Sequence, residues 1–383
     1  MKILFLITNN TLGDGIARHI LEITGYFASH PFYKITPIVC TVLPEADFAR
    51  ALKQKGVKVV SLNAKNGHDF RIIPRFYHLL EEIRPDLIHS HVMALFERFV
   101  LACLKYNIPI ITTCHGIASN DLTGRHNRSF RKLTEKFFMN HFPINLKRKI
   151  YISQGVRDFY QGNNDSVCIY NPISLPPKSE KRYYLHNLLG ISPSSPVIGT
   201  VGRIAPVKNP QSFVNVMCNV LEDVPIAHAV VCGSGPESLQ NELKSLVAAT
   251  SVANRFHWLG YRADAPELTR DLNCFIMTSI SEGLPTALLE AMAARVPVAF
   301  METNGGMIDL AELQRTEGPW GIMVPRDDEN GMIKAIVELL KAPDLQKKLT
   351  EQAVLIIQKH FSIEQIAIQL KSVYQEALTK EKE

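Results

Sequence analysis

The 383-residue sequence lacks several features that would place it in a specialised class of proteins. No apolar run approaches the roughly 18 residues that a membrane-spanning helix needs. The first segment, MKILFLITNN, has too short an apolar stretch for a signal peptide and suits a buried strand instead. The seven cysteines are scattered and form no C-x-x-C pair, which argues against a disulfide framework or a zinc site. We therefore expect a cytoplasmic globular protein.

The amino-acid composition is typical of a soluble protein with more than one domain. Hydrophobic residues make up 46% of the chain, which leaves no reason to expect disorder. The net charge of +5 allows an anionic partner without identifying one. Because a single hydrophobic core usually stops growing below this chain length, we expect two domains.

Short apolar runs alternate with amphipathic stretches along the whole chain. In the first half the runs lie at residues 2–7, 35–43, 57–63, 87–91, 109–116 and 149–153; in the second half they lie at residues 196–203, 227–235, 255–260, 274–281, 296–300 and 321–325. Strands without polar alternation are buried on both faces, as in a parallel sheet covered by helices. The charged, proline-rich segment SLPPKSEKRYY interrupts this pattern and is typical of a linker.

The alternation predicts an α/β fold with two doubly wound, Rossmann-like domains, each with a parallel sheet, and an interdomain cleft. We assign residues 1–175 to the first domain and residues 176–362 to the second. Residues 363–383 follow an amphipathic pattern that predicts a helix crossing back toward the first domain. In such folds ligands bind beyond the carboxyl ends of the strands, so we examined the strand exits.

Three strand exits in the second half carry cations or glycines. In VGRIAPVKN, Gly202, Arg203 and Lys208 follow a strand, where the paired cations suit phosphates; a solvated basic loop is the alternative. In VCGSGPE, Gly233 begins a strand-to-helix turn, although a lone G-x-G often serves only the turn. The segment TNGGM, residues 303–307, repeats the glycine turn.

A fourth exit, SEGLPTALLE, holds two glutamates separated by seven residues. Taken alone, the two glutamates are most simply interpreted as acidic residues on the protein surface. Gly283 allows the chain to turn, and Pro285 fixes the backbone angle φ at a value that suits the start of a helix. The first amide groups of that helix suit a diphosphate. Glu290 lies one turn into that helix, within reach of a ribose diol, while Glu282 faces the group that the diphosphate carries. Together, the four exits predict a nucleotide-diphosphate site.

These segments resemble the retaining glycosyltransferases of family 4, which have the GT-B fold. EGLPTALLE matches the E-x7-E signature of that family, VGRIAPVKN its VGR…K element and CGSGPE its G-x-G-P element. In the first half, GDGIARHILEI resembles the glycine-rich loop, PDLIHSH the strand D-hydrophobic-hydrophobic-H-x-H, and TTCHG the T-x-H-G turn. The matches keep the family order over nearly the whole chain.

The resemblance implies an amino-terminal acceptor-binding domain and a carboxyl-terminal domain that binds a nucleotide-sugar donor. Arg203 and Lys208 would hold the donor diphosphate, and Glu290 would hold the ribose hydroxyls. Glu282 would contact the transferred sugar, and His115 would hydrogen-bond it near the reacting carbon. The glycine-rich loop and the turn backbones complete the implied donor site through Gly13, Gly15, Gly202, Gly233, Gly283, Leu284, Pro285 and Thr286.

The implied reaction transfers a sugar from a nucleotide-diphosphate sugar with retention of configuration. A UDP-sugar is favoured by its frequency in the family, and the implied acceptor is a glycan or glycolipid in cell-surface polysaccharide synthesis. The sequence contains no D-x-D motif, so we expect neither a metal nor a cofactor, with cations and a helix start neutralising the leaving group. The alternatives are a GT-B epimerase or phosphorylase, and a non-catalytic sugar-nucleotide-binding partner subunit.

A basic segment lies between residues 125 and 149. It contains one acid, Glu135, against eight cations: Arg125, Arg128, Arg131, Lys132, Lys136, Lys147, Arg148 and Lys149. Its aromatic residues fall on one helical face, which predicts a basic amphipathic helix in peripheral contact with anionic lipid at the cytoplasmic face of the inner membrane. An exposed helix packed on the sheet is the alternative. No nucleic-acid-binding motif accompanies the segment, so we expect no nucleic acid partner.

Two further histidines, His89 and His91, alternate along one predicted strand. We interpret one of them as facing the core or contributing to the floor of the cleft, in preference to a pair of metal ligands. His115, followed by Gly116 at a strand exit, is the histidine that we predict to be functional.

Overall fold

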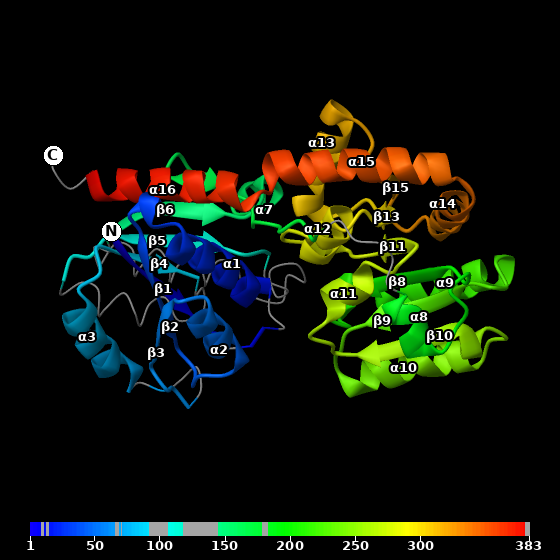
Figure 1. Ribbon diagram of the computed structural model, residues 1–383, viewed down its shortest axis with the longest axis horizontal. Coiled ribbons are helices and arrows are strands. Elements are labelled where there is room, and N and C mark those ends of the chain that lie inside the picture. The colour runs from blue at the N-terminus through cyan, green and yellow to red at the C-terminus, as the bar shows by residue number, and fades with distance from the viewer. Residues whose placement is uncertain are drawn as a thin grey trace. The chain divides into compact units, whose positions relative to one another are not determined.

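A computed structural model describes residues 1–8, 11–12, 15–65, 69, 71–91, 106–117, 145–177 and 183–379. The chain forms two compact units, Met1–Pro172 with Ile363–Glu383, and Ile173–Ser362 (Figure 1). Each unit contains a parallel β-sheet with helices against it. The predicted fold class, two doubly wound α/β domains, is therefore confirmed.

The first unit is built on a seven-stranded sheet in which all neighbours pair in parallel. In sheet order the strands are β3 (Lys58–Ser61), β2 (Thr36–Thr41), β1 (Lys2–Ile7), β4 (Leu87–Ser90), β5 (Ile110–Cys114), β6 (Leu146–Tyr151) and β7 (Ser166–Cys168). The six predicted strands are confirmed. The sequence did not reveal β7, because three residues give no recognisable apolar run. The strand order reverses between β1 and β4, which marks the switch point of this sheet.

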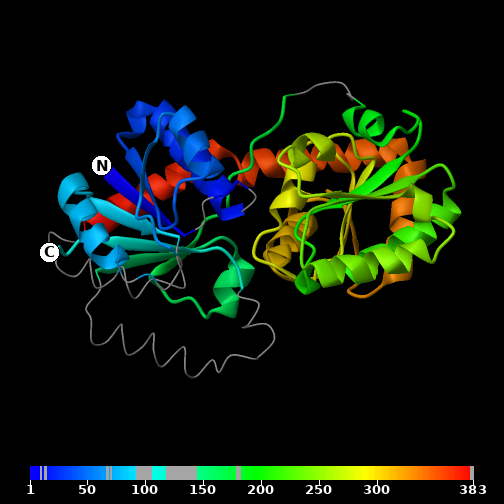
Figure 2. The same cartoon turned by 90° about the horizontal axis from the view of Figure 1, so that it is seen from below.

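Helices from both ends of the chain build the core of the first unit. Among the described residues, the helices of this unit are α1 (Gly15–Ser29), α2 (Asp47–Gln54), α3 (Ile72–Ile83), α7 (Gln154–Phe159) and α16 (Ile363–Thr379). Phe5 of β1, Phe27 of α1 and Tyr374 of α16 are at most 1% exposed and belong to one cluster. Figure 2 shows α16, in red, running along this sheet. The carboxyl-terminal helix is thus part of the first unit's core.

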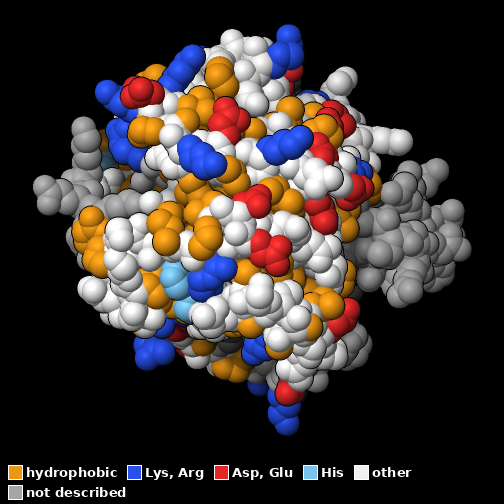
Figure 3. Space-filling view, turned by 90° about the vertical axis from the view of Figure 1, so that its right-hand side faces the viewer, with side chains coloured by type: hydrophobic (Ala, Val, Ile, Leu, Met, Phe, Trp, Pro, Cys, Tyr) orange, Lys and Arg blue, Asp and Glu red, His pale blue; other side chains and the backbone are white. Residues whose placement is uncertain are grey.

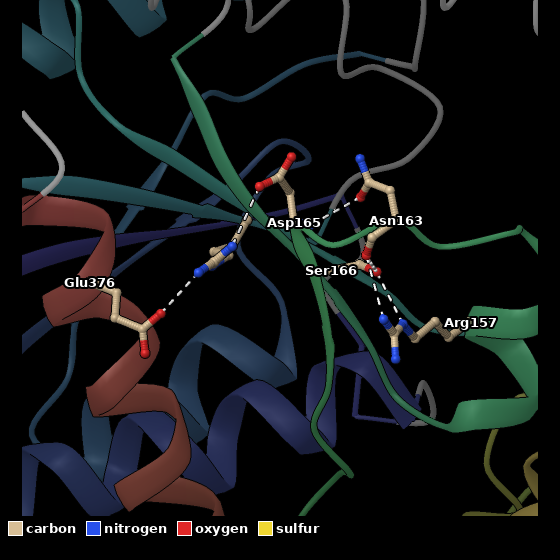
Figure 4. Close-up of polar contacts among 6 residues, drawn as sticks. Arg157, Asn163, Asp165, Ser166 and Glu376 are labelled. Carbon is tan, nitrogen blue, oxygen red and sulfur yellow. Dashed lines mark hydrogen bonds and ion pairs between the residues drawn. The ribbon is translucent and has the colours of Figure 1, made fainter.

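Strand β6 corrects part of the prediction of a basic helix at residues 125–149. It contains the last three cations of the expected basic helix, Lys147, Arg148 and Lys149. A helix is wrong for these residues because the backbone of β6 pairs with β5 on one side and β7 on the other. Arg148 reaches Asp165 (Nη1–Oδ1, 3.5 Å) and Glu376 of α16 (Nη2–Oε2, 3.1 Å; Figure 4). Residues 125–144 lie outside the described residues.

The second unit is built on a six-stranded sheet, also parallel throughout. In sheet order the strands are β10 (Phe256–Gly260), β9 (His228–Cys232), β8 (Val197–Val201), β11 (Cys274–Met277), β13 (Val298–Met301) and β15 (Ile322–Val324). All six predicted strands are confirmed, and the order reverses between β8 and β11. A separate parallel pair, β12 (Ser281–Glu282) with β14 (Asn304–Gly305), was not predicted.

The helices of the second unit are α8 (Tyr184–Leu189), α9 (Pro210–Asp223), α10 (Glu237–Ala248), α11 (Ala265–Thr269), α12 (Thr286–Ala293), α13 (Gly306–Glu317), α14 (Glu329–Lys341) and α15 (Pro343–His360). Trp320, 1% exposed, links α13 to the sheet. Its ring stacks on Phe300 of β13 with centroids 4.6 Å apart, and its Nε1 donates to the carbonyl oxygen of Leu310 at 3.1 Å. Trp320 therefore fixes α13, whose first turn belongs to the site described below.

Acidic and basic side chains are interspersed on the face of the molecule drawn in Figure 3, with hydrophobic side chains scattered among them. Within the described part of the chain, no helix is both long and apolar enough to cross a membrane. The six cysteines in the described ranges form no disulfide.

Candidate active site

The four strand exits singled out in the second half follow four consecutive strands of one sheet. Strands β9, β8, β11 and β13 are neighbours in that order. Because these strands are parallel, their carboxyl ends meet at one edge, which we call the donor edge. The two central strands, β8 and β11, are those between which the strand order reverses. Ligands bind at such a switch point in open α/β sheets.

An ion pair joins the exits of the two central strands. Lys208 Nζ lies 2.6 Å from both Oε1 and Oε2 of Glu282. Lys208 ends the short helical turn η2 (Pro206–Lys208), and the hydroxyl of Thr278 donates to its carbonyl oxygen at 3.2 Å. The Glu282 side chain is 9% exposed and the Lys208 side chain 29% exposed. The lysine is therefore the more accessible partner for a ligand.

Ser279, which the sequence analysis did not single out, also holds Glu282. Its Oγ donates to Glu282 Oε1 at 2.6 Å, and the residue is 4% exposed. Lys208 and Ser279 together engage both carboxylate oxygens, so the carboxylate has one fixed orientation. The sequence held one signal for this role, which was a polar residue two positions after the fully buried strand β11.

The loops at the donor edge pack backbone against backbone, which explains two of the glycines. A Cβ atom on Gly233 would lie 1.8 Å from the carbonyl oxygen of Gly202. A Cβ atom on Gly305, whose φ is +78°, would lie 1.9 Å from the carbonyl oxygen of Glu282. Gly305 also pairs with Glu282 in the β12–β14 ladder. Any larger residue would push apart the loops that carry the ion pair.

Two helices begin at the donor edge. α12 begins at Thr286, directly after three predicted donor residues, Gly283, Leu284 and Pro285, and α13 begins at Gly306. The first amide groups of a helix lack intrahelical partners and carry partial positive charge, which suits a phosphate. Asp309, 6% exposed, lies in the first turn of α13, and the half-buried Glu290 lies one turn into α12.

Two further predicted residues lie at a strand exit. Arg203 and Gly202 are exposed directly after β8, at the donor edge. Gly15 begins α1 of the first unit, whereas Gly13 lies outside the described residues. The structure thus joins Lys208 to Glu282 directly and places Arg203 at the same edge of the sheet.

In the first unit, His115 belongs to a group of histidines. His115 follows β5, and its Nε2 lies 2.7 Å from Nδ1 of His91, which follows β4. The ring of His19, from α1, lies at a steep angle to His115 with centroids 5.4 Å apart. Neither His19 nor His91 was predicted to accompany His115, because residues far apart in sequence meet only through the strand order.

His89, the fourth histidine of the group, is a core residue. Its Nδ1 lies 2.8 Å from the hydroxyl oxygen of Tyr374, and its Nε2 lies 2.7 Å from Oγ1 of Thr113. Its side chain is fully buried, and that of His91 is 4% exposed. One of the two strand histidines therefore faces the core, as we interpreted the alternation.

Burial keeps all four imidazoles neutral near pH 7. It lowers the pKa of His19 to about 4, and burial together with the neighbouring His19 lowers the pKa of His89 to about 3. Burial, and after it the neighbouring histidines, hold the pKa of His91 and of His115 well below the usual value. Each ring therefore offers one N–H donor and one acceptor nitrogen.

Two doubly wound units, one with paired charges and helix starts at its switch point, are typical of the GT-B fold of glycosyltransferases. Two family models match the chain, Glycosyltransferase Family 4 at residues 13–175 and Glycosyl transferases group 1 at residues 195–342. Together they span most of both units, so the chain belongs to glycosyltransferase family 4.

Individual relatives support this assignment. The chain is 25% identical over 281 residues to UDP-Gal:alpha-D-GlcNAc-diphosphoundecaprenol alpha-1,3-galactosyltransferase of Escherichia coli, covering 71% of this chain and 70% of that protein. It is 29% identical over 190 residues to the lipopolysaccharide core biosynthesis mannosyltransferase LpsB of Rhizobium meliloti, covering 49% and 53%. The crystal structure of Anabaena HepE with UDP-glucose has a TM-score of 0.81 at 20% identity, covering 99% of this chain and 100% of that one. That structure shares the fold.

Removing the Ser279 hydroxyl tests how Glu282 is held. Ser279→Ala leaves one oxygen of a buried carboxylate with fewer donors, so the free energy of unfolding should fall by about 1.5–3 kcal/mol. Urea unfolding measures this change. Ser281→Ala is the matched control, because it removes a buried hydroxyl from the same loop. The free energy of unfolding of this variant should fall by less than half as much. Equal losses in the two variants would contradict the assigned role of Ser279.

The buried histidines predict a loss of stability in acid. Their pKa values are lower in the folded state than in the unfolded state, near 6.5, so stability is complete above that pH and falls as the pH drops toward 4. From pH 7 to pH 5, His19 and His89 should each remove about 2 kcal/mol from the free energy of unfolding. Urea unfolding at both pH values should show a smaller acid loss for His89→Gln than for the wild type. An equal loss in both proteins would contradict the buried, neutral state of His89.

Proposed function

We propose that the protein is a retaining glycosyltransferase that moves a sugar from a UDP-sugar to a glycan or lipid-linked acceptor in cell-surface polysaccharide synthesis. The single observation that carries the proposal is the Lys208–Glu282 pair at the switch point of the donor edge. A cation, a fixed carboxylate and two helix starts there suit the phosphates and sugar of one nucleotide sugar.

The cations and the helix starts would bind the phosphates of the donor. When the bond to the sugar breaks, negative charge develops on the departing nucleoside diphosphate. Lys208 and Arg203 supply positive charge at the exit of β8, and the first turns of α12 and α13 add the partial positive charge of a helix start. With these groups the proposed reaction needs no metal ion and no cofactor. Glu290, one turn into α12, would hold the ribose hydroxyls.

Glu282 would bind the transferred sugar, together with His115 in the first unit. Both oxygens of Glu282 already accept hydrogen bonds from Lys208 or Ser279. These partners hold the carboxylate in one orientation, which suits the acceptance of hydrogen bonds from sugar hydroxyls. The same partners reduce its strength as a nucleophile, so we assign Glu282 to binding and electrostatic stabilisation.

The choice of donor and acceptor rests on the relatives. The E. coli protein is named for UDP-Gal and for an acceptor carried on diphosphoundecaprenol, and the Rhizobium protein for lipopolysaccharide core biosynthesis. We propose the same classes of substrate for this chain, a UDP-sugar as the donor and a lipid-linked molecule as the acceptor. The basic residues from 125 to 144 would then contact anionic lipid at the cytoplasmic face of the inner membrane, where such an acceptor is reached.

A donor screen tests the proposed substrate class. A UDP-sugar at about 100 times its dissociation constant should stabilise the fold by about 2.7 kcal/mol. Thermal unfolding with UDP-, GDP- and ADP-sugars should therefore give the largest rise in melting temperature with a UDP-sugar. Lys208→Ala should abolish most of that rise. A larger rise with a GDP- or ADP-sugar would replace the proposed donor, and no rise with any of them would contradict the proposed function.

The two glutamates should fail in different ways. Glu282→Gln keeps the shape but removes the charge beside the reacting sugar, so kcat should fall by about 100-fold or more. Glu290→Gln weakens hydrogen bonds to the ribose, so the donor KM should rise by about 10-fold with a smaller change in kcat. Steady-state release of nucleoside diphosphate measures both constants. The opposite pattern would mean that the two roles are exchanged.

A further inference from the structure

The second unit contains a cleft at the opposite end of its sheet from the donor edge. The cleft has a volume of about 1000 Å³, a size typical of sites for small molecules. Its lining residues, all within this unit, fall at 175–177, 184–187, 264–273, 293–297 and 343–358. Asn273 and Pro297 directly precede β11 and β13, so the cleft lies at the amino-terminal ends of these strands. α12, which begins at the donor edge, ends here between α11 and α15 (Figure 1). We call this site the rear cleft.

Three of the acids that line the rear cleft already have partners within the unit. Asp264 accepts hydrogen bonds from Nε and Nη2 of Arg262, both at 2.8 Å. Glu267 accepts one from Nη1 of Arg270 at 3.0 Å. Asp271, which is 3% exposed, accepts a backbone amide of α8 at 2.8 Å. These carboxylates are therefore engaged in holding the walls of the cleft, and their charge is largely compensated.

Two cations of the rear cleft have no such partner. Arg295 follows the end of α12 and Lys347 lies on α15, and both residues are exposed. Within the described part of the chain, neither forms an ion pair. Glu351, one turn after Lys347 on α15, is the one lining acid that likewise lacks an ion-pair partner among the described residues. Two unpaired cations against one unpaired acid leave the cleft with a net positive charge, which favours an anionic ligand.

An aromatic ring also lines the rear cleft. Tyr184 is 43% exposed, and its hydroxyl donates to Oδ2 of Asp264 at 3.0 Å and accepts from Nη2 of Arg262 at 3.3 Å. The neighbouring wall segment is held as well, because Arg270 Nη2 donates to the carbonyl oxygen of Pro177 at 3.1 Å. The hydroxyl contacts fix the Tyr184 ring while almost half of its surface stays open. A ring held in this way is suited to stack on a planar group of a ligand.

We propose that the rear cleft binds a nucleoside monophosphate, whose base stacks on Tyr184 and whose phosphate pairs with Arg295 and Lys347. A phosphate monoester carries about 1.5 to 2 negative charges near pH 7, which matches two unpaired cations. A guanidinium group can also contact two phosphate oxygens at once. The proposal does not rest on the proposed function, because every lining residue lies away from the donor edge.

Isothermal titration calorimetry of the full chain with AMP, GMP, CMP, UMP and inorganic phosphate tests the proposal. At least one monophosphate should bind about 10-fold more tightly than inorganic phosphate, because stacking on Tyr184 adds to the charge contacts. The same titrations of Lys208→Ala separate the rear cleft from the donor edge, and the affinity of that nucleotide should stay within about twofold. Failure of all four nucleotides to bind Lys208→Ala, or binding no tighter than that of phosphate, would overturn the proposal and leave the proposed function untouched.

Arg295 allows a variant that loses the charge without loss of the fold. Its φ is +60°, in the left-handed region that favours glycine, so Arg295→Gly should be at least as resistant to thermal unfolding as the wild type. The dissociation constant of the nucleotide should nevertheless rise by about 10-fold or more, because a charge-assisted contact is lost. Arg84→Gly is the matched control, since Arg84 is exposed at the end of α3 in the first unit with φ +47°. Unchanged affinity in Arg295→Gly, or equal weakening in both variants, would overturn the proposal.

A second pair of variants tests the stacking of the base. Tyr184→Leu removes the aromatic ring and should raise the dissociation constant of the nucleotide by about fivefold, while that of inorganic phosphate stays within about twofold. Tyr184→Phe keeps the ring and should bind the nucleotide within about twofold of the wild type. Asp264 keeps its contacts with Arg262 in both variants, so the wall of the cleft is preserved. Wild-type affinity for the nucleotide in Tyr184→Leu, or equal losses in the two variants, would overturn the proposed stacking of the base.

Discussion

Close backbone contact between neighbouring loops is the constraint on which the candidate site depends. The chain leaves β9, β8, β11 and β13 at one sheet edge, and Gly233 and Gly305 let those loops approach within the distance that a Cβ atom would occupy. The exits of β8 and β11 are joined by a separate backbone hydrogen bond, from the amide of Ile280 to the carbonyl oxygen of Val207 at 2.8 Å, and by the pair of Lys208 with Glu282. The charge pair is thus a consequence of parallel strand order, which makes these two exits neighbours. Its chemistry follows from that position.

The two units use opposite kinds of polar group. The donor edge presents full charges, which suit a diphosphate, and buries the carboxylate with partners on both oxygens. The histidine group of the first unit is neutral because burial disfavours the charged form of each ring. A neutral ring can bind hydroxyl groups by hydrogen bonds without attracting phosphate.

The sequence predicted the sheets well, because twelve buried strands appear in it as continuous apolar runs. It also indicated Lys208, Glu282 and His115, since charged or aromatic polar residues at strand exits are unusual. It did not indicate β7 or the β12–β14 pair, which are too short to leave a pattern. Ser279, His19 and the contact of His91 with His115 were missed for another reason. Their roles depend on a partner from a distant segment, and only strand order brings such partners together.

The stereochemistry of transfer tests the central claim most directly. The protein would be incubated with the UDP-α-sugar that it binds and with a lipid-linked acceptor, and the anomeric configuration of the new linkage would be read from the proton coupling constant. We predict release of UDP together with an α-linked product. A β-linked product, or release of UDP that leaves the acceptor unmodified, would contradict a retaining glycosyltransferase.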